Sequence, residues 1–382
     1  MEKQRIDYLP LTFLDGTHLR IRNERFLQTR EELEHFLDGK RHLHTKSFAK
    51  DVMFSHEIKA NNQIEGYHDD VLLVRETIAR RYPNKESEQA KRILNLYHGY
   101  NYILREPNIN PETLKKLYSI LSKKLLEEND IARMGEYYRQ DKNFIYPRGI
   151  LSAYPDEGVP VEKIDEFMNA YFEFLNNLDY SKNITDEYIK SQILHFYFVY
   201  IHPYFDVNGR TSRTLAMWYL LNQKAYPYII FNRGITFKGC EYDKAIIDVK
   251  KYQDISFFID YMLKTVQIEL EKEYIMQSIA SSTNKKLTAT DWQTLLYILS
   301  MNGNLSVLDF VATYNRFNDK KTCKEIYETM IDPLISNGIL EITRISNKIM
   351  FDNLPNEMFE INESLMEYDR DDIVRLVRYK NN

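Results

Sequence analysis

The sequence predicts a mainly α-helical chain with a short β-hairpin and a C-terminal unit that resembles a winged helix. Three observations predict this fold class. Apolar residues recur at helical spacing over most of the chain. Glycine and proline interrupt that pattern between residues 135 and 160. After a polar stretch at 280–286, three helical units are followed by one strand-like segment.

Composition limits the class of protein. A chain of 382 residues predicts two or three domains with a substantial core. The net charge of −5 argues against a protein that mainly binds nucleic acid or membrane surfaces, since such proteins usually carry a basic excess. No apolar run approaches the roughly 20 residues that span a bilayer. We therefore expect a cytoplasmic protein with no membrane partner.

The first half of the chain reads as a series of amphipathic helices. Thr29 and Glu32 form a capping-box pair at the start of the first one, and Gly39 ends it. Pro111 lies near the start of another, where proline is tolerated because that N–H has no helical partner. The predicted helices cover about 29–39, 47–66, 69–82, 87–104 and 110–126.

Helices return after the glycine- and proline-rich interruption, in which residues 144–152 are expected to form a small hairpin. The helix predicted over 185–202 is apolar on nearly all sides, which is typical of a buried central helix. A further apolar helix is predicted over 211–223. His195 faces aromatic residues on the central helix, so we expect a buried core histidine there.

The C-terminal unit is predicted over 285–352, with helices at 288–303, 306–314 and 320–340 and a β wing at 341–351. Residues 353–382 are expected to be a solvated, partly helical tail. Basic and acidic residues nearly balance between 285 and 350, at eight and seven, so no strong nucleic-acid footprint exists. The local basic residues are Lys320, Lys321 and Lys324. Docking of a protein is at least as well supported as binding of DNA.

The stretch "IHPYFDVNGRTSR", residues 201–213, joins two of these helices and carries the chemistry. Asn208 and Gly209 tolerate positive φ and suit an anion-binding nest at a helix N-terminus. Arg210 and Arg213 are three residues apart, so they share a helix face and are placed to hold phosphate oxygens.

Two further residues of this stretch complete a candidate site. Asp206 offers a hard oxygen ligand for Mg²⁺ together with substrate phosphates. His202 follows the rigid central helix and suits a general base for a hydroxyl nucleophile. The residue types alone leave an alternative open, which is a plain corner between two helices with a C-terminal histidine and two surface arginines.

The segment "HPYFDVNGRTSR" resembles the signature of the Fic family, His-x-Phe-x-(Asp/Glu)-Gly-Asn-Gly-Arg-x-x-Arg. With Tyr204 as the aromatic, Val207 is the one defined position that departs from it. Supporting context runs over about residues 40–265 and includes "GEYYR", the hairpin region and the apolar helix before the motif. The resemblance implies a Fic-type helical core, placed at 91–280, with the hairpin as a flap that holds a target segment by strand addition.

The resemblance also implies an activity, most commonly transfer of AMP from ATP to a Ser, Thr or Tyr hydroxyl of a target protein or of the protein itself. His202 would then deprotonate the hydroxyl, and Asp206 would bind Mg²⁺ between the α- and β-phosphates. The implied nucleotide-binding residues are Val207, Asn208, Gly209, Arg210 and Arg213. The region around Tyr242 is similar to the family's adenine pocket.

An inhibitory element is implied by "NNQIEG" in residues 61–66. The family's self-inhibited version carries (Ser/Thr)-x-x-x-Glu-(Gly/Asn), and Asn61 departs from its hydroxyl residue. Glu65 would pair with Arg213 and turn it away from the γ-phosphate. The helix at about 47–66 would thus be an inhibitory helix within an N-terminal region spanning 1–90. The alternative is a surface glutamate before a glycine that ends a helix.

These residues favour a self-inhibited adenylyltransferase and leave two rivals open. The same site would serve another nucleotide donor, or would remove AMP from a modified protein with Glu65 positioning a water. Val207 supports a third interpretation, a degenerate Fic domain acting as a nucleotide-sensing or DNA-binding regulator.

Overall fold

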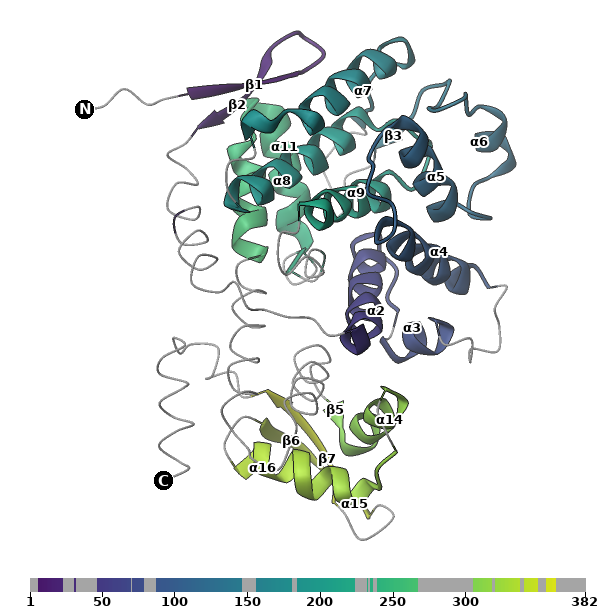
Figure 1. The fold of residues 1–382 in the computed structure, drawn as a ribbon, viewed down its shortest axis with the longest axis vertical. Coiled ribbons are helices and arrows are strands. Elements are labelled where there is room, and N and C mark those ends of the chain that lie inside the picture. The colour runs from purple at the N-terminus through teal and green to yellow at the C-terminus, as the bar shows by residue number, and fades with distance from the viewer. Residues whose placement is uncertain are drawn as a thin grey trace, which may run out of the picture. The chain divides into compact units, whose positions relative to one another are not determined.

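A computed structural model of the chain confirms the mainly helical fold class with a small antiparallel sheet (Figure 1). It describes residues 6–22, 31, 47–69, 71–78, 87–145, 156–180, 184–223, 232, 234–235, 239–266, 305–317, 320–336, 340–349 and 355–361. The chain divides into two compact units, one made of residues 1–42 and 53–268 and the other of 43–52 and 269–382.

The helices of the first unit, together with residues 47–52 at the start of α2, which are grouped with the second unit, follow the apolar periodicity of the sequence. They are α2 (Ser47–Ile64), α3 (Val71–Ile78), α4 (Glu88–Ile103), α5 (Pro111–Leu121), the short α6 (Glu128–Ala132), α7 (Val161–Asn176), α8 (Ile184–Ile201), α9 (Asn208–Asn222) and α11 (Gly239–Tyr252). Residues 256–266 are also helical. Pro111 lies in the first turn of α5, as predicted, and Asn110 and Thr113 form a capping box there.

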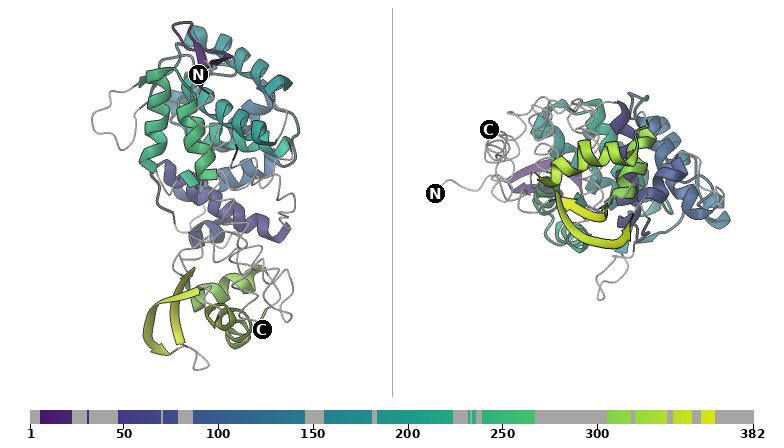
Figure 2. Two further views of the ribbon diagram at one scale, coloured as in Figure 1. Left: turned by 90° about the vertical axis from the view of Figure 1, so that its left-hand side faces the viewer. Right: turned by 90° about the horizontal axis from the view of Figure 1, so that it is seen from below.

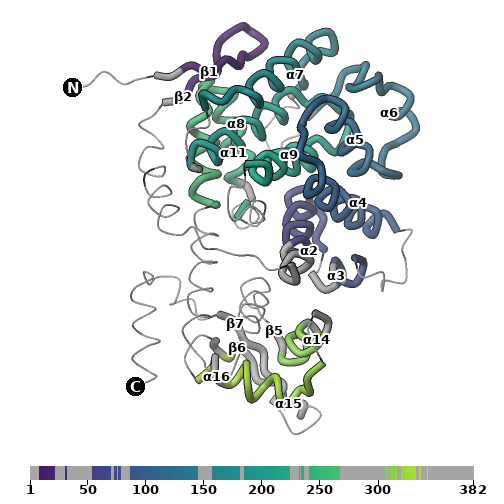
Figure 3. The backbone as a smooth tube through the Cα atoms, viewed as in Figure 1, coloured from purple at the N-terminus to yellow at the C-terminus, as the bar shows by residue number. Residues whose placement is uncertain are grey.

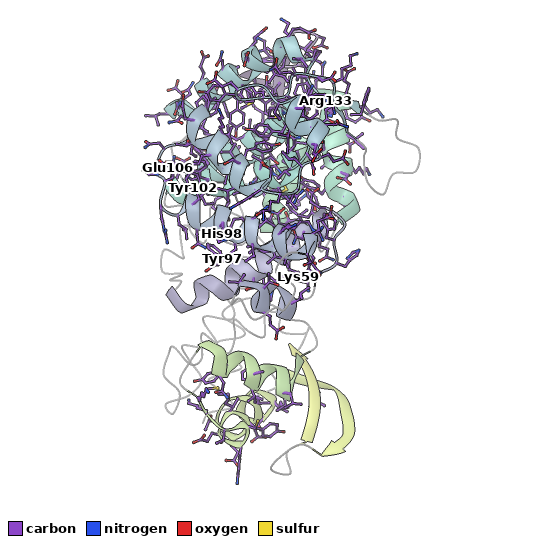
Figure 4. The ribbon with its side chains drawn as sticks, turned by 90° about the vertical axis from the view of Figure 1, so that its right-hand side faces the viewer. Lys59, Tyr97, His98, Tyr102, Glu106 and Arg133 are labelled. Carbon is purple, nitrogen blue, oxygen red and sulfur yellow. The ribbon has the colours of Figure 1, made fainter. Side chains whose placement is uncertain are left out.

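Helix α8 is the centre of this unit. Most of its apolar side chains are buried, because α7 and α9 both pack against it. Helix α9 also packs on α4 and α5. Tyr102 and Glu106 lie next to each other near the end of α4 (Figure 4). Trp218 of α9 packs its ring edge on Tyr102 and donates its indole N–H to the Glu106 carbonyl oxygen at 2.7 Å.

Two small β elements and a helix pair complete the unit. Strands β1 (Ile6–Thr12) and β2 (His18–Arg22) form an antiparallel hairpin beside α7, in the stretch where the sequence is only partly β-like (Figure 3). Helix α11 and the helix at 256–266, both green in Figure 2, pack through aromatic rings such as Tyr242 and Phe258.

The hairpin predicted at 144–152 has a later second strand. Strand β3 (Phe144–Ile145) pairs with β4 (Asp156–Glu157) in antiparallel register, Phe144 opposite Glu157. The predicted return strand around 150–152 lies outside the described residues, as does nearly all of the helix predicted at 29–39.

The second unit contains β5 (Leu305–Ser306), α14 (Val307–Phe317), a helical run formed by α15 (Cys323–Ile326), a π-helical turn (Tyr327–Ile331) and α16 (Asp332–Ser336), and strands β6 (Leu340–Ile349) and β7 (Pro355–Ile361). The three strands form an antiparallel sheet in the order β5-β7-β6. Strand β7 extends the unit beyond residue 352 into the predicted tail. The helix predicted at 288–303 lies outside the described residues.

No helix within the described ranges is long and apolar enough to cross a membrane.

Candidate anion-binding site at the start of helix α9

The loop from His202 to Val207 connects α8 and α9, and both of its ends have left-handed backbone. The φ angle is 53° at His202 and 65° at Val207, which is the N-cap of α9. Histidine enters this region with some frequency, but a β-branched residue there is a genuine outlier, at a cost of about 1–2 kcal/mol. The position where the motif has glycine therefore does require a positive φ, and Val207 occupies it under strain.

Helix α9 begins earlier than the sequence pattern indicated, at Asn208 instead of near Arg210. The first helical hydrogen bond of α9 runs from the Thr211 N–H to the Val207 carbonyl oxygen at 2.9 Å. The N–H groups of Asn208, Gly209 and Arg210 precede that bond, so they are the donors that a helix N-terminus offers to an anion.

The loop is held in shape from within by Asn208 and Tyr204. The Asn208 side chain accepts a hydrogen bond from the Tyr204 N–H at 3.0 Å and donates one to the Tyr204 carbonyl oxygen at 2.7 Å. The Tyr204 ring is buried and stacks on Tyr118, with ring centroids 3.6 Å apart and planes at 10°. Asn208 thus has its backbone N–H, and not its side chain, left to face a ligand.

Arg139 anchors the same loop from a segment far away in sequence. It is 1% exposed, and its Nε donates to the His202 carbonyl oxygen at 2.9 Å. Its two terminal nitrogens donate to the carbonyl oxygens of Asp141 and Val159, each at 2.6 Å. The sequence offered "GEYYR" only as context for this region. The Arg139 guanidinium is thus bound by neutral carbonyl oxygens from several segments, an arrangement that the sequence does not predict.

His202 lies where a neutral base is favoured. Burial is the main cause that lowers the pKa of the His202 imidazole, and together with the positive charges of Lys250 and Arg139 it brings the pKa to about 3. The imidazole is therefore neutral at physiological pH, which is the form that accepts a proton from a hydroxyl group.

Asp206 and Arg210 form a pair at the head of α9, with 3.6 Å between an Asp206 oxygen and an Arg210 terminal nitrogen. Among the described residues, the Arg210 Nε and its other terminal nitrogen have no hydrogen-bond partner, although the residue is only 4% exposed. Buried donors normally have partners. The free guanidinium edge therefore fits an anion such as a phosphate.

The Asp206 carboxylate fits a role as a single protein ligand for Mg²⁺. One oxygen accepts the Val207 N–H at 2.6 Å, and the side chain is 57% exposed. Mg²⁺ commonly uses one or two carboxylates and fills its remaining positions with water and substrate phosphates. The described part of the chain contains no cluster of three or more metal-ligating side chains, so a dedicated all-protein metal cage is absent from it.

Arg213 is buried and held by the segment that carries Glu65. Its guanidinium forms an ion pair with the Glu65 carboxylate across 148 positions of sequence. Burial opposes the positive charge, but the Glu65 carboxylate and the Tyr242 hydroxyl together outweigh it and raise the pKa of Arg213. Helix α2 ends at Ile64, so Glu65 lies in the turn just after the helix, where Gly66 has a φ of 84°.

Gly209 makes the approach of Glu65 sterically possible. A Cβ at this position would collide with a Glu65 carboxylate oxygen and come within 3.1 Å of an Arg213 terminal nitrogen. Absence of a side chain at 209 is therefore required for the observed pairing.

Asn61 and Tyr242 also contact Arg213. The Asn61 side-chain oxygen accepts hydrogen bonds from Arg213 Nε at 3.0 Å and from a terminal nitrogen at 2.8 Å. The Tyr242 hydroxyl lies beside the guanidinium and bonds His195 Nε2 at 2.9 Å. His195 is fully buried, as expected of a core histidine. Tyr242 is 5% exposed and packed into this network.

The structure thus brings the predicted catalytic, nucleotide-binding, metal-binding and inhibitory residues into one region around the start of α9. These residues are Glu65, His202, Asp206, Val207, Asn208, Gly209, Arg210 and Arg213. Sequence reasoning missed Arg139 and the direct contact of Asn61 with Arg213. Two buried arginines, a helix N-terminus and a neutral histidine make this region a candidate anion-binding site in a helical domain.

Comparison with known proteins agrees with this class. Residues 108–220 match the sequence model of the Fic/DOC family. Proteins of this family generally modify other proteins by nucleotidyl transfer, and the family includes degenerate members.

Two solved structures share the fold. A Fic family protein from Desulfovibrio desulfuricans is 16% identical, with a TM-score of 0.54 over 88% of this chain and 95% of that one. A segment of Fic-1 from C. elegans is 15% identical, with a TM-score of 0.51 over 65% of this chain and 71% of that one.

Proposed function

We propose that this protein is an adenylyltransferase that moves AMP from ATP to a Ser, Thr or Tyr hydroxyl of a target protein and is held inactive by Glu65. One observation carries the proposal, the ion pair that joins Glu65 to the buried Arg213 beside the N-terminus of α9. The pair supports the proposal because a carboxylate that holds this arginine would compete with a phosphate group for the same guanidinium.

The triphosphate would lie against the head of α9. The N–H groups of Asn208, Gly209 and Arg210 offer hydrogen bonds to it, and the unpartnered nitrogens of Arg210 add a charged clamp. Asp206 would hold Mg²⁺, which supplies charge neutralisation at the phosphates when bound. Arg213, once free of Glu65, would take the terminal phosphates.

His202 would supply the proton transfer. Neutral imidazole accepts the proton of the target hydroxyl as its oxygen forms a bond to the α-phosphorus. The bond from the α-phosphorus to the bridging oxygen breaks, and pyrophosphate leaves. Arg139 bonds the His202 carbonyl oxygen and would fix the backbone that carries the base. A cytoplasmic location, where ATP is plentiful, belongs to this proposal.

The test is incubation of the whole protein with α-labelled ATP and Mg²⁺. Glu65→Gly should incorporate label into the protein itself, and adding His202→Ala should abolish it. His98→Ala is the matched control, because His98 is an exposed histidine of α4 (Figure 4) and should leave labelling intact. No label in any variant with any divalent metal would refute the proposal. Glu65-dependent release of AMP from a modified target would instead assign hydrolytic removal of AMP, with Glu65 positioning the attacking water.

A second candidate function is nucleotide sensing without transfer, and the geometry of Val207 favours it. The Val207 N–H, a potential donor to phosphate, is bonded to the Asp206 carboxylate, the potential metal ligand. While this hydrogen bond is made, the N–H is not available to phosphate and one carboxylate oxygen is not available to a metal ion, and the backbone is strained as well. Binding of ATP without transfer in the Glu65→Gly variant would support this function.

We also propose that the second unit is a winged-helix accessory domain that docks a protein. The order of α14, the helical run 323–336 and the β6–β7 pair supports that fold. Two of the three local lysines are engaged, Lys324 with Glu328 at 3.8 Å and Lys321 over the Tyr314 ring. Because these two lysines already contact other side chains and acidic residues lie among them, the unit fits a protein partner better than DNA. Specific retention of a DNA duplex by the full chain would contradict this.

A further inference from the structure

Arg213 is held at two points by one segment of the chain. The Asn61 oxygen sits between Arg213 Nε and one terminal nitrogen, at 3.0 and 2.8 Å, and Glu65 pairs with the same terminal nitrogen. Asn61 lies in the last turn of α2 and Glu65 directly follows the helix, and both side chains reach the same guanidinium. Both therefore draw the guanidinium toward the same segment.

The orientation of the Asn61 amide is fixed by its surroundings. Arginine has only donors, so the amide oxygen must face Arg213. The amide nitrogen then faces Tyr100 and donates to its hydroxyl at 3.2 Å. Burial raises the pKa of Tyr100, which keeps that hydroxyl protonated. Asn61 is fully buried, so water has no access with which to replace its hydrogen bonds to Arg213.

The two holding points differ in kind. Glu65 is charged, its side chain is 20% exposed, and it lies in a turn. Asn61 is neutral, buried and within α2, which spans Ser47–Ile64. Salt screens a partly exposed ion pair but has little effect on a buried neutral hydrogen bond, so the Glu65 contact is the one that depends on ionic strength.

We propose that Asn61 is a positioning residue that keeps Arg213 on α2 independently of Glu65, so that removing Glu65 alone releases Arg213 only in part. This rests on the proposed function, in which Arg213 is needed by the terminal phosphate of ATP. The usual hydroxyl residue at position 61 is shorter than asparagine, and the amide oxygen is what reaches both nitrogens of the guanidinium in this chain.

The experiment measures the affinities of the full chain for ATP and ADP with Mg²⁺ by titration calorimetry. Their ratio isolates the terminal phosphate. The ratio should be near one in the wild type and should rise in Glu65→Gly. It should rise further in Glu65→Gly/Asn61→Ala, by roughly tenfold, the factor expected for one more charge-assisted hydrogen bond. Glu65→Gly/Asn61→Asp should return it toward one, because a charged acceptor holds Arg213 more strongly.

Asn62→Ala is the matched control in the Glu65→Gly background. Asn62 is also buried on α2, but it donates to Asp69 at 2.7 Å, and its loss should leave the ratio unchanged. If Asn61→Ala leaves the ratio unchanged, if Asn62→Ala shifts it equally, or if Asn61→Asp raises it, the inference is wrong. Asn61→Ser replaces the alanine variant if that variant does not fold.

The same titrations separate this inference from the proposed function. Absence of any nucleotide binding in every variant would overturn both. A ratio that follows Asn61 while no label is ever transferred would overturn the transferase proposal and support the positioning role. Transfer of label together with an ATP/ADP affinity ratio that does not change with Asn61 would support the transferase proposal and overturn the positioning role.

Discussion

Val207 gives a direct test of backbone strain at the head of α9. Its φ of 65° is unfavourable for any residue with a Cβ and most unfavourable for a β-branched one. Its side chain is nonetheless 2% exposed, so it contributes apolar burial. Val207→Gly removes both strain and burial, whereas Val207→Ala removes two methyl groups and keeps a Cβ in the left-handed region.

The difference between the two variants isolates the strain. At an ordinary φ, glycine would be less stable than alanine by about 1.5 kcal/mol, since it lacks a buried methyl worth about 0.8 kcal/mol and loses about 0.5–1 kcal/mol more chain entropy on folding. Relief of the left-handed strain returns about 1–2 kcal/mol to glycine. The two variants should therefore unfold with free energies within about 0.5 kcal/mol of each other.

Denaturant unfolding of the full-length variants measures this difference, and α-labelled ATP measures its consequence. Val207→Gly in the Glu65→Gly background should raise labelling, because the Val207 N–H gains freedom to turn from Asp206 toward phosphate. A glycine variant less stable than the alanine variant by 1.5 kcal/mol or so would refute the strain argument. Unchanged or lower labelling would show that valine is accommodated without functional cost.

Two further predictions concern residues that support the loop. Because the folded pKa of His202 is about 3 and the unfolded value is about 6.5, the unfolded chain binds more protons between these values, so stability falls as pH falls through that window. His202→Gln should lose less stability than the wild type between about pH 7 and pH 5, measured by unfolding at each pH; equal losses would contradict the low pKa. Arg139→Ala should lower the unfolding free energy by at least about 3 kcal/mol, since three carbonyl oxygens lose their donors. Arg139→Lys should not restore it, because an ammonium lacks the planar fork, and full recovery in calorimetry would count against this anchor.

Most of the helical fold could be predicted from periodicity. The helix predicted at 185–202, apolar on nearly all sides, is the buried α8, which ends at Ile201, and Pro111 begins α5 as expected. The pattern failed where local signals are weak. The first turn of α9 carries Asn208 and Gly209, which read as a loop, and the packing of α9 on α8 makes them helical. The second strand of the flap pairs later than its composition indicated, because pairing register depends on partners distant in sequence.

Residue types at fixed spacing determined the candidate site: the sequence by itself placed a histidine, an acid, small residues and two arginines in one loop, and a glutamate before a glycine far upstream. Distances between residues within about a dozen positions follow from helix geometry, so the roles of residues 202–213 could be predicted from the sequence. The contacts that set the state of the site join distant segments, and tertiary packing alone decided them. Packing aimed Asn61 and Glu65 at Arg213, turned the Arg139 guanidinium onto backbone carbonyls, and forced Val207 into the left-handed region. Each is a pairing of buried polar groups or a strained angle whose cost is met by the surrounding core, and no local pattern encodes it.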